Sequence, residues 1–154
     1  MQRIALGDFL VIAEIHCGVD AHQLARIPRV TSLASAALAA PFAGFGDYEL
    51  FPQTYEKAAI YCSRITRYHP LPDGNKRTAY DVMREFLDRN DLRFTHPANG
   101  LDGTAQVIED LAAELLAEPD FIAWLQARVT PTPLPAPAPA PPRASSWGRR
   151  RSRS

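Results

Sequence analysis

Residues 69–77 read HPLPDGNKR and interrupt an otherwise helical chain. Proline lacks a backbone N–H and clashes with the preceding helical turn, so Pro70 and Pro72 exclude a helix interior here. The segments on both sides, residues 54–69 and 75–90, carry apolar residues at helical spacing. The sequence therefore predicts two amphipathic helices joined by a turn that brings the end of one to the start of the other.

Shorter helical patterns occupy much of the remaining chain. We expect them at residues 9–17 (capped by Asp8), 33–40, 104–116 and 121–129. Residues 42–53, FAGFGDYELFPQ, combine glycines, aromatics and a proline, which favours a small β-hairpin. No other segment resembles a strand, and residues 19–31 look irregular. The prediction is an all-α fold of about six helices with one hairpin.

Charge and proline divide the chain into two parts. All five basic residues after Thr130 are arginines in a stretch without acids, which leaves 12 basic against 17 acidic residues, a net charge of −5, in residues 1–130. Seven of the 14 prolines fall between 131 and 142, where an extended spacer is favoured. We expect a domain at 1–130 and a disordered Pro-rich, Arg-rich tail at 131–154.

The charge distribution also bears on partners. An acidic body is not typical of a nucleic-acid-binding domain. The arginine-rich end of the tail suits RNA, an anionic lipid or an acidic partner, or is a solvated extension without a defined role.

Cysteine content and hydropathy indicate a cytoplasmic protein. Cys17 and Cys62 have neither metal-site spacing nor a disulfide framework. Each reads either as a small buried residue or as a catalytic thiol. No apolar run approaches the ~20 residues needed to cross a bilayer. Residues 1–16 lack a small-residue cleavage site, so we do not expect a signal peptide.

The turn itself carries the residues of a phosphate-transfer site. His69 can exchange a proton near neutral pH, and Asp73 is a hard oxygen ligand suited to Mg²⁺. Gly74, Asn75 and Lys76 begin a helix, whose unpaired N–H groups and dipole attract anions. With Arg77 as a further cation, these groups together are typical of phosphoryl or nucleotidyl transfer to a hydroxyl. The structural alternative is a Pro-Asp-Gly turn near an unrelated histidine.

Helical spacing gives two expectations about orientation. His69 follows Cys62 by seven residues, so we expect its ring to point toward the interior. Asp81 lies one helical turn beyond Arg77, which favours an ion pair as much as a catalytic role.

The stretch HPLPDGNKR resembles the signature loop of the Fic/Doc family, His-Pro-Phe-x-Asp/Glu-Gly-Asn-Gly/Lys-Arg. It is most similar to the Doc branch, toxins of toxin–antitoxin pairs, whose loop carries Asn-Lys-Arg-Thr-Ala as residues 75–79 do. The likeness extends over residues 50–91 and, more weakly, over 4–129.

The resemblance implies roles for these residues. His69 would be the general base that deprotonates a target hydroxyl, and Asp73 would hold Mg²⁺ on the phosphates of ATP. Residues 74–76 would form the anion hole and Arg77 would neutralise phosphate charge. Arg67 matches a basic position of Doc proteins and either faces the nucleotide or is a solvated helix arginine. The 42–53 hairpin would be the flap that clamps a target segment.

Departures from the family pattern favour one reaction. Adenylyl-transferring members continue Gly-Asn-Gly-Arg-x-x-Arg, whereas this chain has Lys76 for the second glycine and Tyr80 for the second arginine. In Doc-like proteins the same changes accompany an inverted nucleotide and γ-phosphate transfer. Leu71 replaces phenylalanine, a conservative change. The sequence lacks the Ser/Thr-x-x-x-Glu-Gly/Asn inhibitory motif, so inhibition by a separate antitoxin is implied.

We therefore expect a Doc-like toxin that transfers the γ-phosphate of Mg·ATP to a Ser or Thr hydroxyl of the translation machinery. By resemblance the best candidate target is elongation factor Tu, and a Phd-like antitoxin would cover the cleft. The alternatives are a Fic-type protein adenylyltransferase and a catalytically inactive binding module.

Overall fold

The computed structural model describes residues 1–96 and 103–142. This part of the chain forms seven α-helices and two separate pairs of antiparallel strands. The helices are α1 (Leu6–Cys17), α2 (Ala21–Leu24), α3 (Pro28–Ala39), α4 (Thr54–Tyr68), α5 (Asn75–Arg89), α6 (Thr104–Ala112) and α7 (Glu118–Gln126). The all-α prediction is confirmed. The additional helix is the short α2, and α3 begins at Pro28, so the expectation that residues 19–31 are irregular is wrong for most of that segment.

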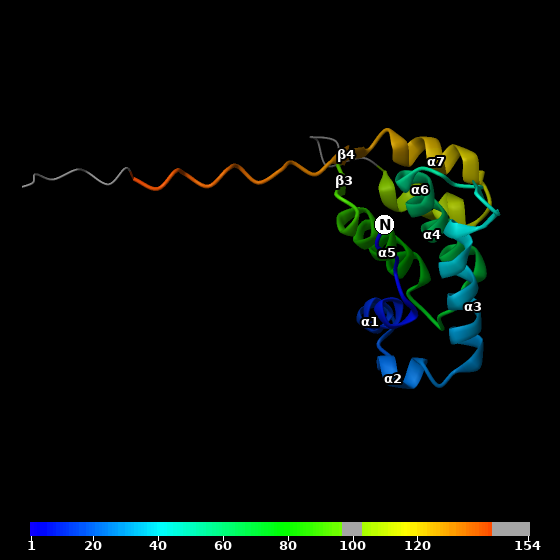
Figure 1. Ribbon diagram of the computed structural model, residues 1–154. Helices are drawn as coiled ribbons and strands as arrows, with labels where there is room; N and C mark the ends of the chain where they lie inside the picture. Colours follow the sequence, from blue (N-terminus) through cyan, green and yellow to red (C-terminus); the bar gives the residue numbers. More distant parts are fainter. Residues whose placement is uncertain (97–102, 143–154) are drawn as a thin grey trace, which may run out of the picture.

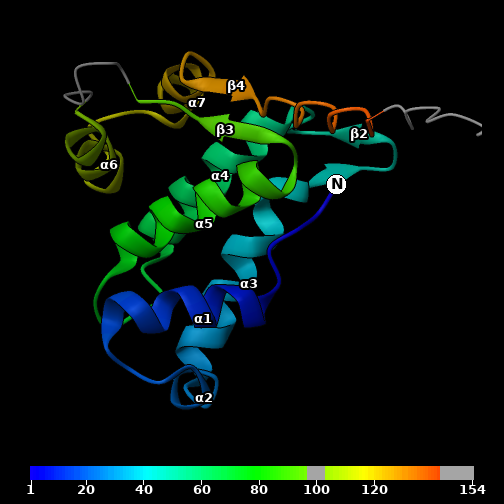
Figure 2. The same cartoon turned by 90° about the vertical axis from the view of Figure 1, so that its left-hand side faces the viewer.

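Helices α4 and α5 form the antiparallel centre of the fold (Figures 1 and 2). α1 packs on α5, whereas α3 and α7 pack on α4. The rings of Tyr61 and Phe86 meet edge to face between α4 and α5, with centroids 4.9 Å apart, and both are fully buried. The core is thus built on the two helices that flank the turn.

Helix α3 runs antiparallel to α4, as contacts at its two ends show. At its start, the Arg29 guanidinium donates a hydrogen bond to the carbonyl of His69 (3.2 Å). After its end, beyond the 3₁₀ turn Ala40–Phe42, the carbonyl of Pro41 accepts from the Lys57 ammonium (3.4 Å). The segment that follows α3 therefore lies at the N-terminal end of α4.

That segment forms the expected hairpin, β1 (Gly44–Phe45) and β2 (Tyr48–Glu49). Lys57, only 1% exposed, fixes its base. Its ammonium group donates to the Glu49 carboxylate (3.1 Å) and to the carbonyl of Phe51 (2.5 Å). These oxygen acceptors offset the cost of burying a cation near a helix N-terminus.

A second strand pair was not expected. β3 (Leu92–Phe94) pairs with β4 (Val129–Pro131), and the Thr132 N–H donates to the carbonyl of Asp91 (2.9 Å). The predicted boundary after residue 130 therefore falls within β4. Residues 133–142 are exposed and contain no helix or strand. The arginine-rich end of the predicted tail lies outside the described residues.

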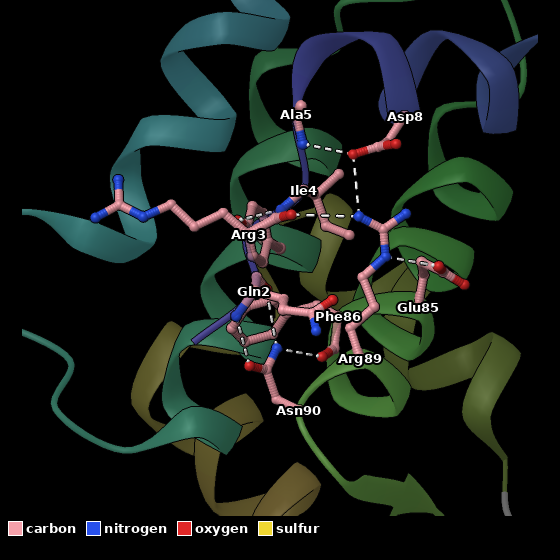
Figure 3. Close-up of polar contacts among 10 residues, drawn as sticks. Gln2, Arg3, Ile4, Ala5, Asp8, Glu85, Phe86, Arg89 and Asn90 are labelled. Atoms are coloured by element: carbon pink, nitrogen blue, oxygen red, sulfur yellow. Dashed lines mark hydrogen bonds and ion pairs between the residues drawn. The ribbon is translucent and has the colours of Figure 1, made fainter.

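The N-terminal segment, residues 2–5, is held against the end of α5 by hydrogen bonds (Figure 3). The Asn90 amide accepts from the Gln2 N–H (2.8 Å) and donates to its carbonyl (2.9 Å). The Arg89 guanidinium donates to the carboxylate of Asp8 (3.0 Å), which also accepts from the Ala5 N–H (2.9 Å). Asp8 is therefore not the N-cap but the third residue of α1.

For Cys62 the structure favours the reading as a small buried residue over the reading as a catalytic thiol. Cys62 is fully buried, and burial raises the pKa of its thiol to about 12. The thiol therefore stays protonated at neutral pH, which removes its nucleophilic form. Among the described residues, no helix has both the length and the apolar character required to cross a membrane.

A charged network joins α7 to α4. The Arg64 guanidinium donates two hydrogen bonds to the Glu118 carboxylate, each 3.0 Å long, and the Ser63 hydroxyl donates a third (2.6 Å). Burial opposes ionisation of Glu118, but these hydrogen bonds outweigh it and hold the pKa of the carboxyl below its usual range.

We expect Glu118→Gln to lower the free energy of unfolding at pH 7 by about 1–2 kcal/mol, because hydrogen bonds to a charged group are lost. The depressed pKa means that this contribution is present above the unfolded-state pKa near 4.5 and is lost as pH falls through the folded-state value. Urea unfolding at pH 7 and at pH 3 measures both effects. Glu114→Gln, which changes an exposed pair, serves as control. A variant as stable as wild type at pH 7 would contradict this account.

Candidate functional site

The candidate site begins where α4 ends. His69 follows the last residue of α4, and its N–H still bonds the carbonyl of Ile65 (3.1 Å). Its backbone is left-handed, with φ 52°, a conformation uncommon outside glycine. Because the backbone of His69 is not helical, its seven-residue spacing from Cys62 does not predict where its side chain points. The expectation that His69 points to the interior is therefore wrong, and its side chain is exposed.

The turn that follows is held by one buried side chain. Asn75 is 4% exposed, and its amide accepts from the N–H of Leu71 and donates to the carbonyl of Leu71, both at 2.9 Å. Leu71 is 1% exposed and plugs the core beneath the turn. The Asn75 side chain thus makes its hydrogen bonds to the turn itself.

Gly74 is the N-cap of α5, at a position where a residue with a side chain does not fit. Its φ is 77°, and a Cβ at this position would lie 2.8 Å from the carbonyl oxygen of His16. The first hydrogen bond within α5 runs from the Thr78 N–H to the Gly74 carbonyl (3.0 Å). The three preceding N–H groups, those of residues 75–77, have no partner in their own helix, as is general for a helix start. This end of α5 favours an anion.

A pocket of about 720 Å³ opens at this turn. Three parts of the chain line it: His16 at the end of α1; residues 69, 72–77 and 80 of the turn and α5; and residues 104, 105, 108 and 109 of α6. Six predicted site residues are thereby brought to one cavity: His69, Asp73, Gly74, Asn75, Lys76 and Arg77.

Arg67 is a predicted site residue that lies apart from the other six. It does not line this pocket, and its guanidinium lies 3.7 Å from the carboxylate of Glu114. Its side chain is 38% exposed. In the structure Arg67 therefore fits the reading as a solvated helix arginine.

The pocket carries charges of both signs. Lys76 and Arg77 are exposed, as is Asp73. The Lys76 ammonium donates to the Glu109 carboxylate of α6 (2.8 Å). Within residues 1–96 and 103–142, Arg77 and Asp73 take part in no ion pair. A cation and a carboxylate thus remain available to a ligand.

Two contacts near the pocket join residues that lie far apart in the sequence. Asp81 accepts a hydrogen bond from His16 (2.5 Å), and among the described residues it makes no ion pair with Arg77, one of the two roles left open for it. This contact ties the end of α1 to α5. Glu109 was missed, since no local pattern links α6 to residue 76. Both contacts depend on how distant helices pack.

The hairpin does not border the pocket. It precedes the N-terminus of α4, whereas His69 follows its C-terminus, and a helix of 15 residues spans about 22 Å. No residue of 42–53 lines the pocket. The expectation that this hairpin clamps a segment over His69 is therefore wrong. The local pattern identified a hairpin but contained no information about its distance from the turn.

The site is suited to a magnesium ion in the presence of phosphate. The described residues contain no cluster of three or more side chains able to hold a metal. Mg²⁺ commonly binds through one or two carboxylates, with phosphate oxygens and water as the remaining ligands. Asp73, an exposed carboxylate beside the N-terminus of α5, fits that pattern.

Comparison with known proteins identifies the family. The model of the Fic/DOC family matches residues 9–87, just over half of the chain. The chain belongs to the Fic/DOC family. The match includes most of α1, all of α4 and nearly all of α5, but ends before α6. Members of the Fic/DOC family generally transfer nucleotide-derived groups to proteins.

A curated relative supports the Doc-like character of this Fic/DOC protein. The present chain is 38% identical over 61 residues to this relative, the protein named Toxin Doc of Mycolicibacterium smegmatis (strain ATCC 700084 / mc(2)155). The matched region covers 40% of this chain and 47% of the relative, so the chain spans about half the length of that relative. No solved structure matches the chain.

We expect Asn75→Ala to destabilise the fold and to weaken anion binding together. The substitution leaves two buried backbone groups of Leu71 unpaired, at a cost of about 1–3 kcal/mol. Asn75→Asp keeps the acceptor but not the donor, so its cost should be smaller. Thermal unfolding and Mg·ATP binding of both variants measure the effect. Unchanged stability of Asn75→Ala would show that the turn does not depend on this side chain.

Proposed function

We propose that this Fic/DOC protein is a Doc-like toxin that transfers the γ-phosphate of Mg·ATP to a Ser or Thr hydroxyl of a translation factor. The observation that carries the proposal is the meeting of a histidine, a carboxylate, two cations and a helix N-terminus in one pocket. The relative named Toxin Doc supports the toxin assignment.

In this reaction His69 is the general base. The neutral imidazole takes the proton of the target hydroxyl while its oxygen attacks the γ-phosphorus. The bond from the γ-phosphorus to the bridging oxygen breaks, and ADP leaves with the bonding electrons. The exposed position of His69 at the pocket makes its ring accessible to a protein substrate.

The start of α5 binds the phosphates. Its N–H groups and the side chains of Lys76 and Arg77 stabilise negative charge that spreads over the transferred group. When bound at Asp73, Mg²⁺ would supply further neutralisation of the phosphate oxygens. Asn75 holds the turn, so that the base and the phosphate site keep their separation.

The choice of phosphoryl over adenylyl transfer rests on residues 76 and 80. Lys76 and Tyr80 both line the pocket, where adenylyl-transferring relatives carry glycine and arginine. A lysine side chain narrows the phosphate site, and the lost arginine removes a charge partner. These two features favour an inverted nucleotide with its γ-phosphate toward His69.

The partners and setting follow from this reaction. The proposed target is elongation factor Tu, and the proposed inhibitor is a Phd-like antitoxin whose helical segment covers the cleft. ATP and translation factors place the reaction in the cytoplasm. We also propose that the chain beyond β4 is a Pro-rich, Arg-rich tail outside the catalytic domain.

Intact-mass measurement of elongation factor Tu after incubation with the protein and Mg·ATP tests the proposal. We expect a gain of about 80 Da, the mass of one phosphate group, and no gain with His69→Ala because the base is lost. A gain of about 329 Da would establish adenylyl transfer instead. No gain at all with wild type would exclude this target.

A further inference from the structure

We propose that Glu109 tunes nucleotide binding by competing with a nucleotide phosphate for the ammonium group of Lys76. The inference rests on the proposed function, because it concerns the same phosphate site. It adds a regulatory residue that lies outside residues 69–77 and outside the region matched by the Fic/DOC family.

The contact between Glu109 and Lys76 lies at the pocket surface. Nζ of Lys76 is 2.8 Å from Oε2 of Glu109, and the two side chains are 47% and 56% exposed. Both residues line the pocket. Exposed ion pairs contribute little to stability, so this pair opens at small cost when a ligand offers a stronger partner.

A triphosphate is such a partner. Lys76 is the second residue of α5, so its side chain starts beside the N–H groups that favour an anion. The ammonium group has three donors and can contact a phosphate oxygen and a carboxylate at once. A carboxylate that stays beside a triphosphate repels it, whereas one that leaves gives up its ion pair. Glu109 lowers nucleotide affinity in both cases.

The position of Glu109 does not depend on its ion pair. Ile108 and Leu111, 5% and 2% exposed, bury the inner face of α6, and Thr104 is also buried. α6 packs on α4, α5 and α7. Removing the charge of Glu109 therefore leaves α6 in place, and the carboxylate remains near the pocket when Lys76 releases it.

Glu109 also bears on inhibition in cis. The sequence lacks the known inhibitory motif, which led to the expectation of a separate antitoxin. The structure nevertheless places an acid of the same chain on a cation of the phosphate site. This contact favours a resting state of reduced nucleotide affinity without involving the motif.

Calorimetric titration of the full chain with Mg·ATP tests the inference. We expect Glu109→Gln to lower Kd about fivefold, the order expected for the loss of an exposed competing charge, and Glu109→Ala to act in the same direction. Glu114→Gln is the matched control: it removes the same charge from a residue paired with Arg67 outside the pocket, and should leave Kd unchanged. The difference in Kd between Glu109→Gln and wild type should become smaller at high salt, because salt screens the interaction between exposed charges.

A double-mutant cycle identifies the route of the effect. In a Lys76→Met background Glu109→Gln should lower Kd much less, because the shared ammonium group is absent and only the repulsion between carboxylate and triphosphate remains to be relieved. An unchanged or higher Kd for Glu109→Gln would overturn the inference, as would an equal gain in the Lys76→Met background. If wild type binds Mg·ATP and transfers a group while Glu109→Gln behaves identically, the inference fails but the proposed function stands. If wild type binds no Mg·ATP, both fail.

Discussion

The paired hydrogen bonds between the Asn75 side chain and the Leu71 backbone hold the turn on which the site depends. They close a turn in which the chain reverses direction between its two central helices. Because Asn75 is also the first residue of α5, the same side chain fixes where that helix starts. The end of α4, with His69, and the N-terminus of α5 are thereby held side by side.

Two distant helices complete the pocket around this turn. The carbonyl of His16 lies so close to Gly74 that no side chain fits there, and its ring bonds to Asp81. The N-terminal segment, pinned to Asn90 at the far end of α5, positions α1 for this contact. From the other side, α6 brings Glu109 to Lys76. The pocket therefore depends on packing across the whole domain.

Local patterns in the sequence were sufficient for the centre of the fold and for the residues of the turn. Helical periodicity and two prolines located α4, α5 and the break between them. The six predicted residues that line the pocket lie within 69–77, so their closeness follows from the turn itself. The hairpin was also recognisable, since glycines and aromatics between breakers are a local signal.

Long-range geometry accounts for the differences. The hairpin lies at the opposite end of α4 from His69, which no local pattern encodes. The left-handed backbone of His69 ends the helical spacing from which its orientation was inferred. Pairing of β3 with β4 places Arg93 opposite Thr130, 37 positions further along the chain, and each strand has too few residues to give a periodic signal. The contacts of Asp81 and Glu109 likewise depend on helix packing.

The central claim is that the N-terminus of α5 binds the phosphates of a nucleotide. Titrating the isotope-labelled protein with Mg·ATP and following its backbone amide NMR signals tests this claim most directly. The account predicts that the largest shifts occur at residues 74–77, which include the three N–H groups of residues 75–77 that have no partner in their own helix. Largest shifts at the hairpin, with residues 74–77 unchanged, would contradict it.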